Sequence, residues 1–499
     1  MPASDTFRRR VFAAFGWSLL QNFGGRVLAL LGSLILARFL GPTEFGLANA
    51  AVLTVFLAAM VADLGFADAI ARHEGLTAED GNLPFAISLL LAVLLAAGAA
   101  LASGPISRLL GAGGLAPLLA ASMALVPVVV AATFQEAWYR RAHRFRELAQ
   151  RTLVCVGASG VVGVACALAG LGAWALVAQF ATQALLSAAW MWARPAWVPS
   201  RRLRRATLRP LCAFGLNLAG LRVLDFATMR AVDALILARH GTETLGYFAI
   251  AGRIVQTLNQ LLQASVNSVA LSVLREIVPD PARLARAFLR TVFLAAMFAG
   301  PAFLGLAATA PELVRLVFGP EWMRAGPVLV PMLVAGTAQC IQLVAGAFLL
   351  SAGRSDLVLR LVLVKACIVL PGLILGGTGD AAATARLLAA LLLAEFPVAL
   401  GVTARFLGLR WEPVLRAVGL PLAAGLAGLA ASAALRVLLP AGGSDLGSLA
   451  QLSAAFVLAA GVTALATGRS AYREGLAFLV SGLRGAGDPD GRPGRTAQP

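Results

Sequence analysis

Long apolar stretches, each bounded by a short charged break, follow one another along almost the whole chain. Hydrophobic residues make up 59% of the 499 positions, and charged residues only 13%. A stretch of about 20 apolar residues is long enough to cross the hydrocarbon core of a bilayer as an α-helix. The stretches are continuous, whereas the strands of a membrane barrel alternate in polarity over about ten residues. The sequence therefore predicts an all-α, polytopic membrane protein.

We expect about 14 transmembrane helices, with ends that are approximate. Their predicted limits are 15–39, 44–70, 84–103, 115–138, 150–170, 172–193, 211–238, 243–274, 287–307, 325–351, 357–376, 383–404, 414–436 and 447–467. With both termini in the cytoplasm, most of the 41 Lys and Arg residues fall in cytoplasmic segments, as the positive-inside rule requires. Topology and attraction to anionic membrane lipid thus explain the net charge of +17, and no nucleic acid partner is expected.

A repeated phrase divides the chain into two related halves. Leu34–Arg38 (LILAR) returns as Leu235–Arg239, and a pair of glycines five residues apart follows each copy, Gly41 with Gly46 and Gly241 with Gly246, with one residue missing from the second copy. An internal repeat in a membrane chain predicts two similar helix bundles, as in many transporters. We expect two six-helix lobes related by a pseudo-twofold axis, at 1–205 and 206–406, two extra helices at 407–467, and a cytoplasmic tail at 468–499 that is disordered at its end.

Signals for an enzyme are missing from the sequence. The only lysine, Lys365, is followed by alanine, so no phosphate-binding Gly-Lys-Ser/Thr loop is present. The three histidines lie in separate predicted loops, and the five cysteines lie far apart in apolar stretches. We therefore expect no catalytic residue, no metal site, no cofactor and no disulfide framework.

Polar residues inside the bilayer are costly, so each one is a candidate for function. The seventh predicted helix holds four charged residues within an arc of roughly 140°: Arg222, Asp225, Arg230 and Asp233. They could line a polar cavity or pair with one another at i,i+3, Arg222 with Asp225 and Arg230 with Asp233, and the two interpretations are compatible.

The eighth predicted helix has a polar stripe roughly 80° wide, which lipid cannot satisfy. The stripe consists of Arg253, Gln256, Gln260, Gln263 and Asn267. It faces either a wet cavity or a hydrogen-bonded neighbouring helix. Asn22 and Arg26 lie on a similar face of the first helix, and an arginine among amides suits a polyanionic head group that carries sugars.

The remaining ionisable residues that lie away from the ends of predicted helices are Asp63, Lys365 and Glu395. Together with Asp225 and Asp233 they are candidates for coupling transport to a proton or sodium gradient. Structural pairing between buried charges is the alternative.

A series of phrases resembles bacterial polysaccharide flippases (Wzx-like) of the multidrug/oligosaccharidyl-lipid/polysaccharide exporter superfamily. The phrases are Ile35–Gly46 (ILARFLGPTEFG), Ala62–Gly65 (ADLG), Arg144–Ala149, Gly172–Val177, Asp233–Tyr247, Phe318–Trp322 and Ala352–Asp356. The resemblance implies a transporter of the bacterial cytoplasmic (inner) membrane that moves a polyprenyl-pyrophosphate-linked oligosaccharide between leaflets by alternating access, for O-antigen or exopolysaccharide synthesis. It also implies cationic pyrophosphate ligands on the first and eighth helices, where Arg26 and Arg253 lie here, and a polysaccharide polymerase and export machinery as possible partners.

Three other functions stay open at this point. A cation-coupled multidrug antiporter of the same superfamily would need an acidic cavity, whereas the candidate helices here supply Arg26, Arg222, Arg230 and Arg253. A membrane polysaccharide polymerase would need a large outer loop, and the predicted outer loops are short. A peptidoglycan-precursor flippase would share the fold and differ in its head group.

Overall fold

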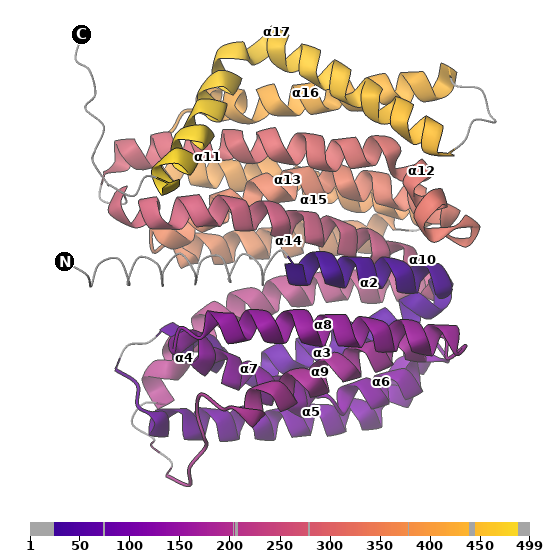
Figure 1. Cartoon of the computed structure of the whole chain (residues 1–499), viewed down its shortest axis with the longest axis vertical. Coiled ribbons are helices and arrows are strands. Elements are labelled where there is room, and N and C mark those ends of the chain that lie inside the picture. Colours follow the sequence, from indigo (N-terminus) through magenta and orange to yellow (C-terminus); the bar gives the residue numbers. More distant parts are fainter. Residues whose placement is uncertain are drawn as a thin grey trace. The chain divides into compact units, whose positions relative to one another are not determined.

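The computed structural model describes residues 24–72, 75–202, 204, 208–277, 280–377, 379–438 and 445–487. Within these ranges the side chains of residues 72, 208–219, 221–222, 263–277, 470–471 and 474–487 are not described. The described residues form helices and the segments that connect them, without a strand (Figure 1).

The helices have the following bounds: α2 (Gly25–Phe39), α3 (Pro42–Asp63), α4 (Phe66–Arg72), η2 (Ala78–Gly81), α5 (Asn82–Leu109), α6 (Leu115–Met123), α7 (Val126–Arg141), α8 (Phe145–Leu168), α9 (Trp174–Ala193), α10 (Leu208–Ile277), α11 (Pro281–Ala299), η3 (Gly300–Leu304), α12 (Gly305–Phe318), η4 (Pro320–Ala325), α13 (Gly326–Ser351), α14 (Ser355–Gly376), α15 (Ala381–Phe406), α16 (Trp411–Leu438) and α17 (Asp445–Gly487).

The prediction of an all-α membrane protein is confirmed. The predicted transmembrane stretches are mostly helical where their residues are described, and two of them contain a turn, at Leu64 and Gly65 and at Ala124 and Leu125. Among the described residues, ten helical segments are long and apolar enough to cross a membrane: Pro42–Asp63, Ala78–Leu109, Leu115–Arg141, Phe145–Leu168, Pro281–Phe318, Pro320–Ser351, Ser355–Gly376, Ala381–Phe406, Trp411–Leu438 and Asp445–Arg469. The seventh and eighth predicted stretches both lie in α10, whose backbone leaves helical geometry at Gly241 (φ 81°, ψ −178°), a conformation open mainly to glycine.

The predicted stretch 44–70 is divided into two helices, although its sequence is largely apolar. Instead of a single helix over 44–70, α3 ends at Asp63, Leu64 and Gly65 adopt positive φ values, and the short helix α4 follows. Asp63 accepts a hydrogen bond from the backbone N–H of Ala67 at 3.1 Å, so its carboxylate supports the first turn of α4. Asp63 is therefore at a helix end rather than in the middle of a helix.

The chain folds into two compact units. The first comprises Met1–Thr257, Leu313–Met332 and Val358–Glu395, and in it α2 packs on α8, α8 on α9, and α5 on α6. The second comprises Leu258–Glu312, Leu333–Leu357 and Phe396–Pro499, and in it α16 packs on α11 and α17. The lobe limits expected from the repeat remain a prediction. The backbone of α17 is helical through Gly487, and residues 488–499 of the expected tail lie outside the described residues.

In the first unit, each of the two repeated arginines binds the C-terminal end of another helix. Arg38 donates to the carbonyls of Leu316 and Val317, in the last turn of α12, at 3.1 and 2.9 Å. Arg239 donates to the carbonyls of Leu373 and Ile374, in the last turn of α14, at 2.9 and 2.7 Å. Because the final carbonyls of a helix lack partners within it, a guanidinium stabilises such an end by hydrogen bonds and by charge.

The repeated glycines bring two helix starts close together. Gly46 on α3 and Gly246 on α10 lie so near the opposite backbone that neither position has room for a Cβ atom. Beside them the buried indole of Trp322 donates to the carbonyl of Ala37 at 2.8 Å and meets the ring of Phe45 edge-on. These contacts join the beginning of both repeat copies within one unit.

Candidate functional site

The charged face of α10 begins with an ion pair to another helix. Asp225 contacts Lys365 of α14 through its Oδ1 atom, and the lysine Nζ donates. The lysine side chain is 16% exposed and the aspartate side chain 47% exposed. Sequence reasoning proposed Arg222 as the partner of Asp225, and the side chain of Arg222 lies outside the description. The pair neutralises two charges that would be costly if buried separately.

The predicted i,i+3 approach of Arg230 and Asp233 is present. A terminal nitrogen of Arg230 lies 2.5 Å from Asp233 Oδ2, and its guanidinium lies over the Phe226 ring, 4.9 Å from the ring centre. Nevertheless Nε and Nη1 of Arg230 are buried without a hydrogen bond of acceptable geometry, because the contact with Asp233 is close but poorly directed. Arg230 therefore retains donors that an acceptor of the right shape could use.

Arg253 has surroundings unlike those of the two ion pairs. It lies on α10 in the half that follows Gly241, and its side chain is partly buried. Among the described residues its guanidinium has no hydrogen-bond or ion-pair partner. The backbone carbonyl of Arg253 accepts a hydrogen bond from the hydroxyl of Thr257, which leaves the guanidinium uninvolved. A partly buried arginine without a carboxylate provides uncompensated positive charge.

The other members of the predicted polar stripes differ in how exposed they are. Gln256 is exposed and Gln260 is partly buried, and the boundary between the two units falls between them, after Thr257. Arg26 on α2 is partly buried and takes part in a polar interaction. Asn22 lies outside the described residues, as do the side chains of Gln263 and Asn267.

Two of the candidates for ion coupling have different environments. Glu395 on α15 is 2% exposed and takes part in a polar interaction. Asp63 is partly buried at the end of α3, where it supports the next helix. Asp63 thus has a structural role that the sequence did not suggest, and a coupling role for either residue stays a prediction.

The described charged candidates on α10 form two ion pairs, Asp225 with Lys365 and Asp233 with Arg230, whereas Arg253 has no partner among the described residues. In the described part of the chain, no group of three or more His, Cys, Asp or Glu side chains could hold a metal ion. These two pairs are neutral overall, so Arg253 adds positive charge to α10. Such an arrangement suits the binding of an anion inside a membrane protein.

Sequence reasoning missed the partner of Asp225 and the ring under Arg230. Phe226 lies four residues before Arg230, a spacing that places both side chains on one helix face and could have indicated the contact. Lys365 is 140 residues from Asp225, and no periodicity within one helix reveals a partner at that distance.

Comparison with known proteins gives one family match and several relatives. The model of the family described as "Polysaccharide biosynthesis protein" matches residues 35–327. The succinoglycan biosynthesis transport protein ExoT of Rhizobium meliloti (strain 1021) is 27% identical over 314 residues, which are 63% of this chain and 64% of that protein. The lipopolysaccharide biosynthesis protein WzxC of Escherichia coli (strain K12) is 23% identical over 381 residues, which are 74% of this chain and 76% of that protein. The chain thus spans slightly less than two thirds of ExoT.

Solved structures share the fold at low sequence identity. The lipid II flippase MurJ in an inward closed conformation has a TM-score of 0.73 and 10% identity, with 91% of this chain and 98% of that chain covered. An inward-facing multidrug resistance MATE family transporter of the MOP superfamily has a TM-score of 0.56 and 16% identity, with 77% and 94% covered. At these identities the likeness concerns the fold alone.

Proposed function

Because the chain belongs to the polysaccharide biosynthesis protein family, as its sequence resemblance predicted, we propose that it is a flippase for a polyprenyl-pyrophosphate-linked oligosaccharide. It moves the head group across the cytoplasmic (inner) membrane of a bacterium by alternating access, during synthesis of a surface polysaccharide. The multi-span helical fold and the transport and lipopolysaccharide relatives support this proposal.

The observation that carries the proposal is the environment of Arg253. A pyrophosphate offers several acceptor oxygens and negative charge, which match a guanidinium that has no partner among the described residues. Arg26 on α2 and the unused donors of Arg230 are the next ligands in the proposal, with Arg222 as a further cation. The amides Asn22, Gln256, Gln260, Gln263 and Asn267 would bind sugar hydroxyls.

The lipid tail stays in the bilayer in this mechanism. Moving an isoprenoid chain through water would cost about 0.8 kcal/mol per CH₂ group, whereas leaving it in lipid costs little. Only the head group therefore needs a polar path. Two lobes at 1–205 and 206–406 would alternate around it, with the helices at 407–467 appended and both termini in the cytoplasm. A polysaccharide polymerase and export machinery would take up the product.

The movement of a charged head group is coupled to the membrane potential at about 2.3 kcal/mol per charge per 100 mV, and a cation that moves in the opposite direction would add driving force. Asp225, Asp233, Glu395, Asp63 and Lys365 are the proposed coupling residues. Transport into vesicles should slow when both the proton and the sodium gradients are collapsed. An unchanged rate under those conditions would rule out coupling and leave the flippase proposal standing.

The test in cells uses a strain that lacks this gene. We expect its lipid-linked oligosaccharides, measured by mass spectrometry, to accumulate while surface polysaccharide disappears. Accumulation of a lipid-linked cell-wall precursor instead would favour the peptidoglycan role. Wild-type protein and the Arg283→Ala control, an exposed position on α11, should restore export, whereas Arg253→Ala should not, at equal membrane levels.

A further inference from the structure

The segment between α9 and α10 is fixed to the helices of the first unit although it has no helix or strand. We call residues 194–202 together with Arg204 the strap. Asn82 at the start of α5 donates to Ser200 Oγ and to the carbonyl of Arg202, at 2.7 and 2.9 Å, and accepts from the Ser200 backbone N–H at 3.0 Å. Gln135 of α7 donates to the carbonyl of Trp197 at 2.6 Å. The strap backbone is therefore held in place by side chains of helices.

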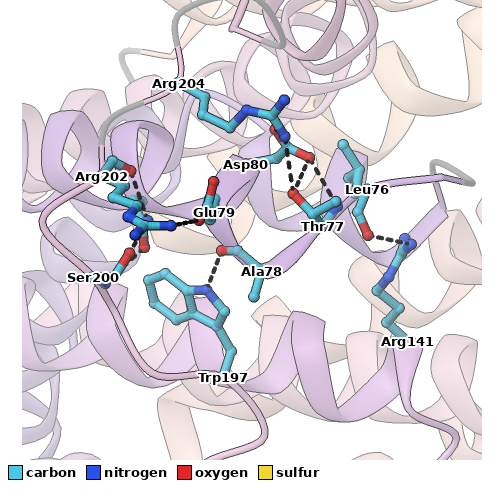
Figure 2. Close-up of polar contacts among 11 residues, drawn as sticks. Leu76, Thr77, Ala78, Glu79, Asp80, Arg141, Trp197, Ser200, Arg202 and Arg204 are labelled. Carbon is cyan, nitrogen blue, oxygen red and sulfur yellow. Dashed lines mark hydrogen bonds and ion pairs between the residues drawn. The ribbon is translucent and has the colours of Figure 1, made fainter.

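One residue of the strap is anchored in the protein interior while the next is left outside. Trp197 is 3% exposed and stacks on Trp138, with ring centres 5.8 Å apart. Its indole donates to the carbonyl of Ala78 at 2.6 Å (Figure 2). Val198 is 66% exposed. An exposed apolar side chain beside basic residues is typical of a segment at the membrane interface.

The arginines of the strap remain exposed. Arg202 lies 3.0 Å from Glu79 and Arg204 lies 3.6 Å from Asp80, with their side chains 81% and 51% exposed (Figure 2). Ion pairs this open to solvent are weak and leave the guanidinium groups able to contact other anions. Arg201 is exposed and has no ion-pair partner among the described residues.

We propose that the strap is a docking surface for anionic phospholipid head groups at this end of the helices. The arginines 201, 202 and 204 contact lipid phosphates, and Val198 enters the boundary between head groups and acyl chains. The rigid backbone matters because a preorganised surface loses less conformational entropy when lipid binds. Lipid bound here holds the first unit at the interface, whatever head group the protein transports.

The experiment uses full-length purified protein in nanodiscs made from equal parts of phosphatidylglycerol and phosphatidylcholine. Native mass spectrometry then counts the lipids of each type that stay bound. We expect wild-type protein to retain phosphatidylglycerol preferentially, and Arg201→Gln/Arg202→Gln/Arg204→Gln to lower that preference about tenfold. The matched control, Arg283→Gln/Arg286→Gln/Arg290→Gln on α11, removes the same charge from exposed positions and should keep the preference.

A second variant distinguishes a loss of lipid binding from a change in folding. Arg201→Glu reverses one charge and leaves the contacts of Arg202 with Glu79 and of Arg204 with Asp80 intact, so it should lower the preference without unfolding the strap. Equal losses in the strap variant and in the α11 control would overturn the proposal, as would a wild-type protein without lipid preference. The readout is lipid binding, so failure of polysaccharide transport would not affect it.

Discussion

Gly46 and Gly246 occupy equivalent places in the two repeat copies, and each lies against the start of the other's helix. A Cβ atom on Gly46 would stand 2.2 Å from the carbonyl oxygen of Thr242, and one on Gly246 would stand 2.0 Å from that of Pro42. Pro42 and Thr242 are themselves equivalent, since each follows the first glycine of its copy. The contact is therefore reciprocal, as expected for two copies related by a local twofold axis.

Because Gly46 lies so close to the opposite backbone, we expect Gly46→Ala to destabilise the protein. The obstructing atoms belong to the backbone and cannot rotate away, so the helices must move apart, at a cost of about 1–3 kcal/mol in the free energy of unfolding. Thermal unfolding in detergent measures the effect. The control is Gly252→Ala, in the same helix as Gly246, where a Cβ would meet nothing within 4 Å and alanine should stabilise by up to about 1 kcal/mol. Equal behaviour of the two variants would contradict the close contact.

The two repeated arginines should act on stability and not on transport. Arg38→Gln and Arg239→Gln remove the positive charge from the ends of α12 and α14, which should lower the free energy of unfolding by up to about 1 kcal/mol each. Surface polysaccharide should persist when membrane levels are matched. Loss of export by either variant at a normal protein level would show instead that these arginines bind the head group.

A double-mutant cycle tests the pair of Asp225 and Lys365. Asp225→Asn or Lys365→Met alone leaves a partner charge inside the protein, which should cost about 1–3 kcal/mol of stability. The double variant should be more stable than the sum of the two single losses predicts. As a control, the exposed pair of Glu412 and Arg416 on α16 should show a coupling energy below about 1 kcal/mol. Additive losses at Asp225 and Lys365 would mean that the two charges do not interact.

The helices could be predicted because apolar length and positive charge act locally along the chain. The same local reasoning found the repeated phrases that end at Arg38 and Arg239, and both guanidinium groups contact the last carbonyls of another helix. It failed at Asp63, where the positive φ values of Leu64 and Gly65 end the helix inside an apolar run that hydropathy cannot distinguish from a continuous span.

The partners of the charged residues could not be predicted in the same way. Periodicity compares residues on one helix, so it paired Arg230 with Asp233 and offered Asp225 only Arg222. Lys365 reaches Asp225 from α14 through tertiary packing. The isolation of Arg253 is likewise a property of its neighbours in space, and the sequence indicated only that its helix has a polar face.

The central claim is that Arg253 binds the phosphate groups of a lipid-linked oligosaccharide during transport. Purified protein in proteoliposomes, supplied with a fluorescent polyprenyl-pyrophosphate oligosaccharide, allows the rate of translocation to be measured directly. We expect translocation by wild-type protein, a loss of about tenfold to a hundredfold in Arg253→Ala, and partial recovery in Arg253→Lys, since a charge-assisted hydrogen bond contributes about 1.5–3 kcal/mol. Equal rates for wild type and Arg253→Ala would show that Arg253 does not bind the phosphate groups.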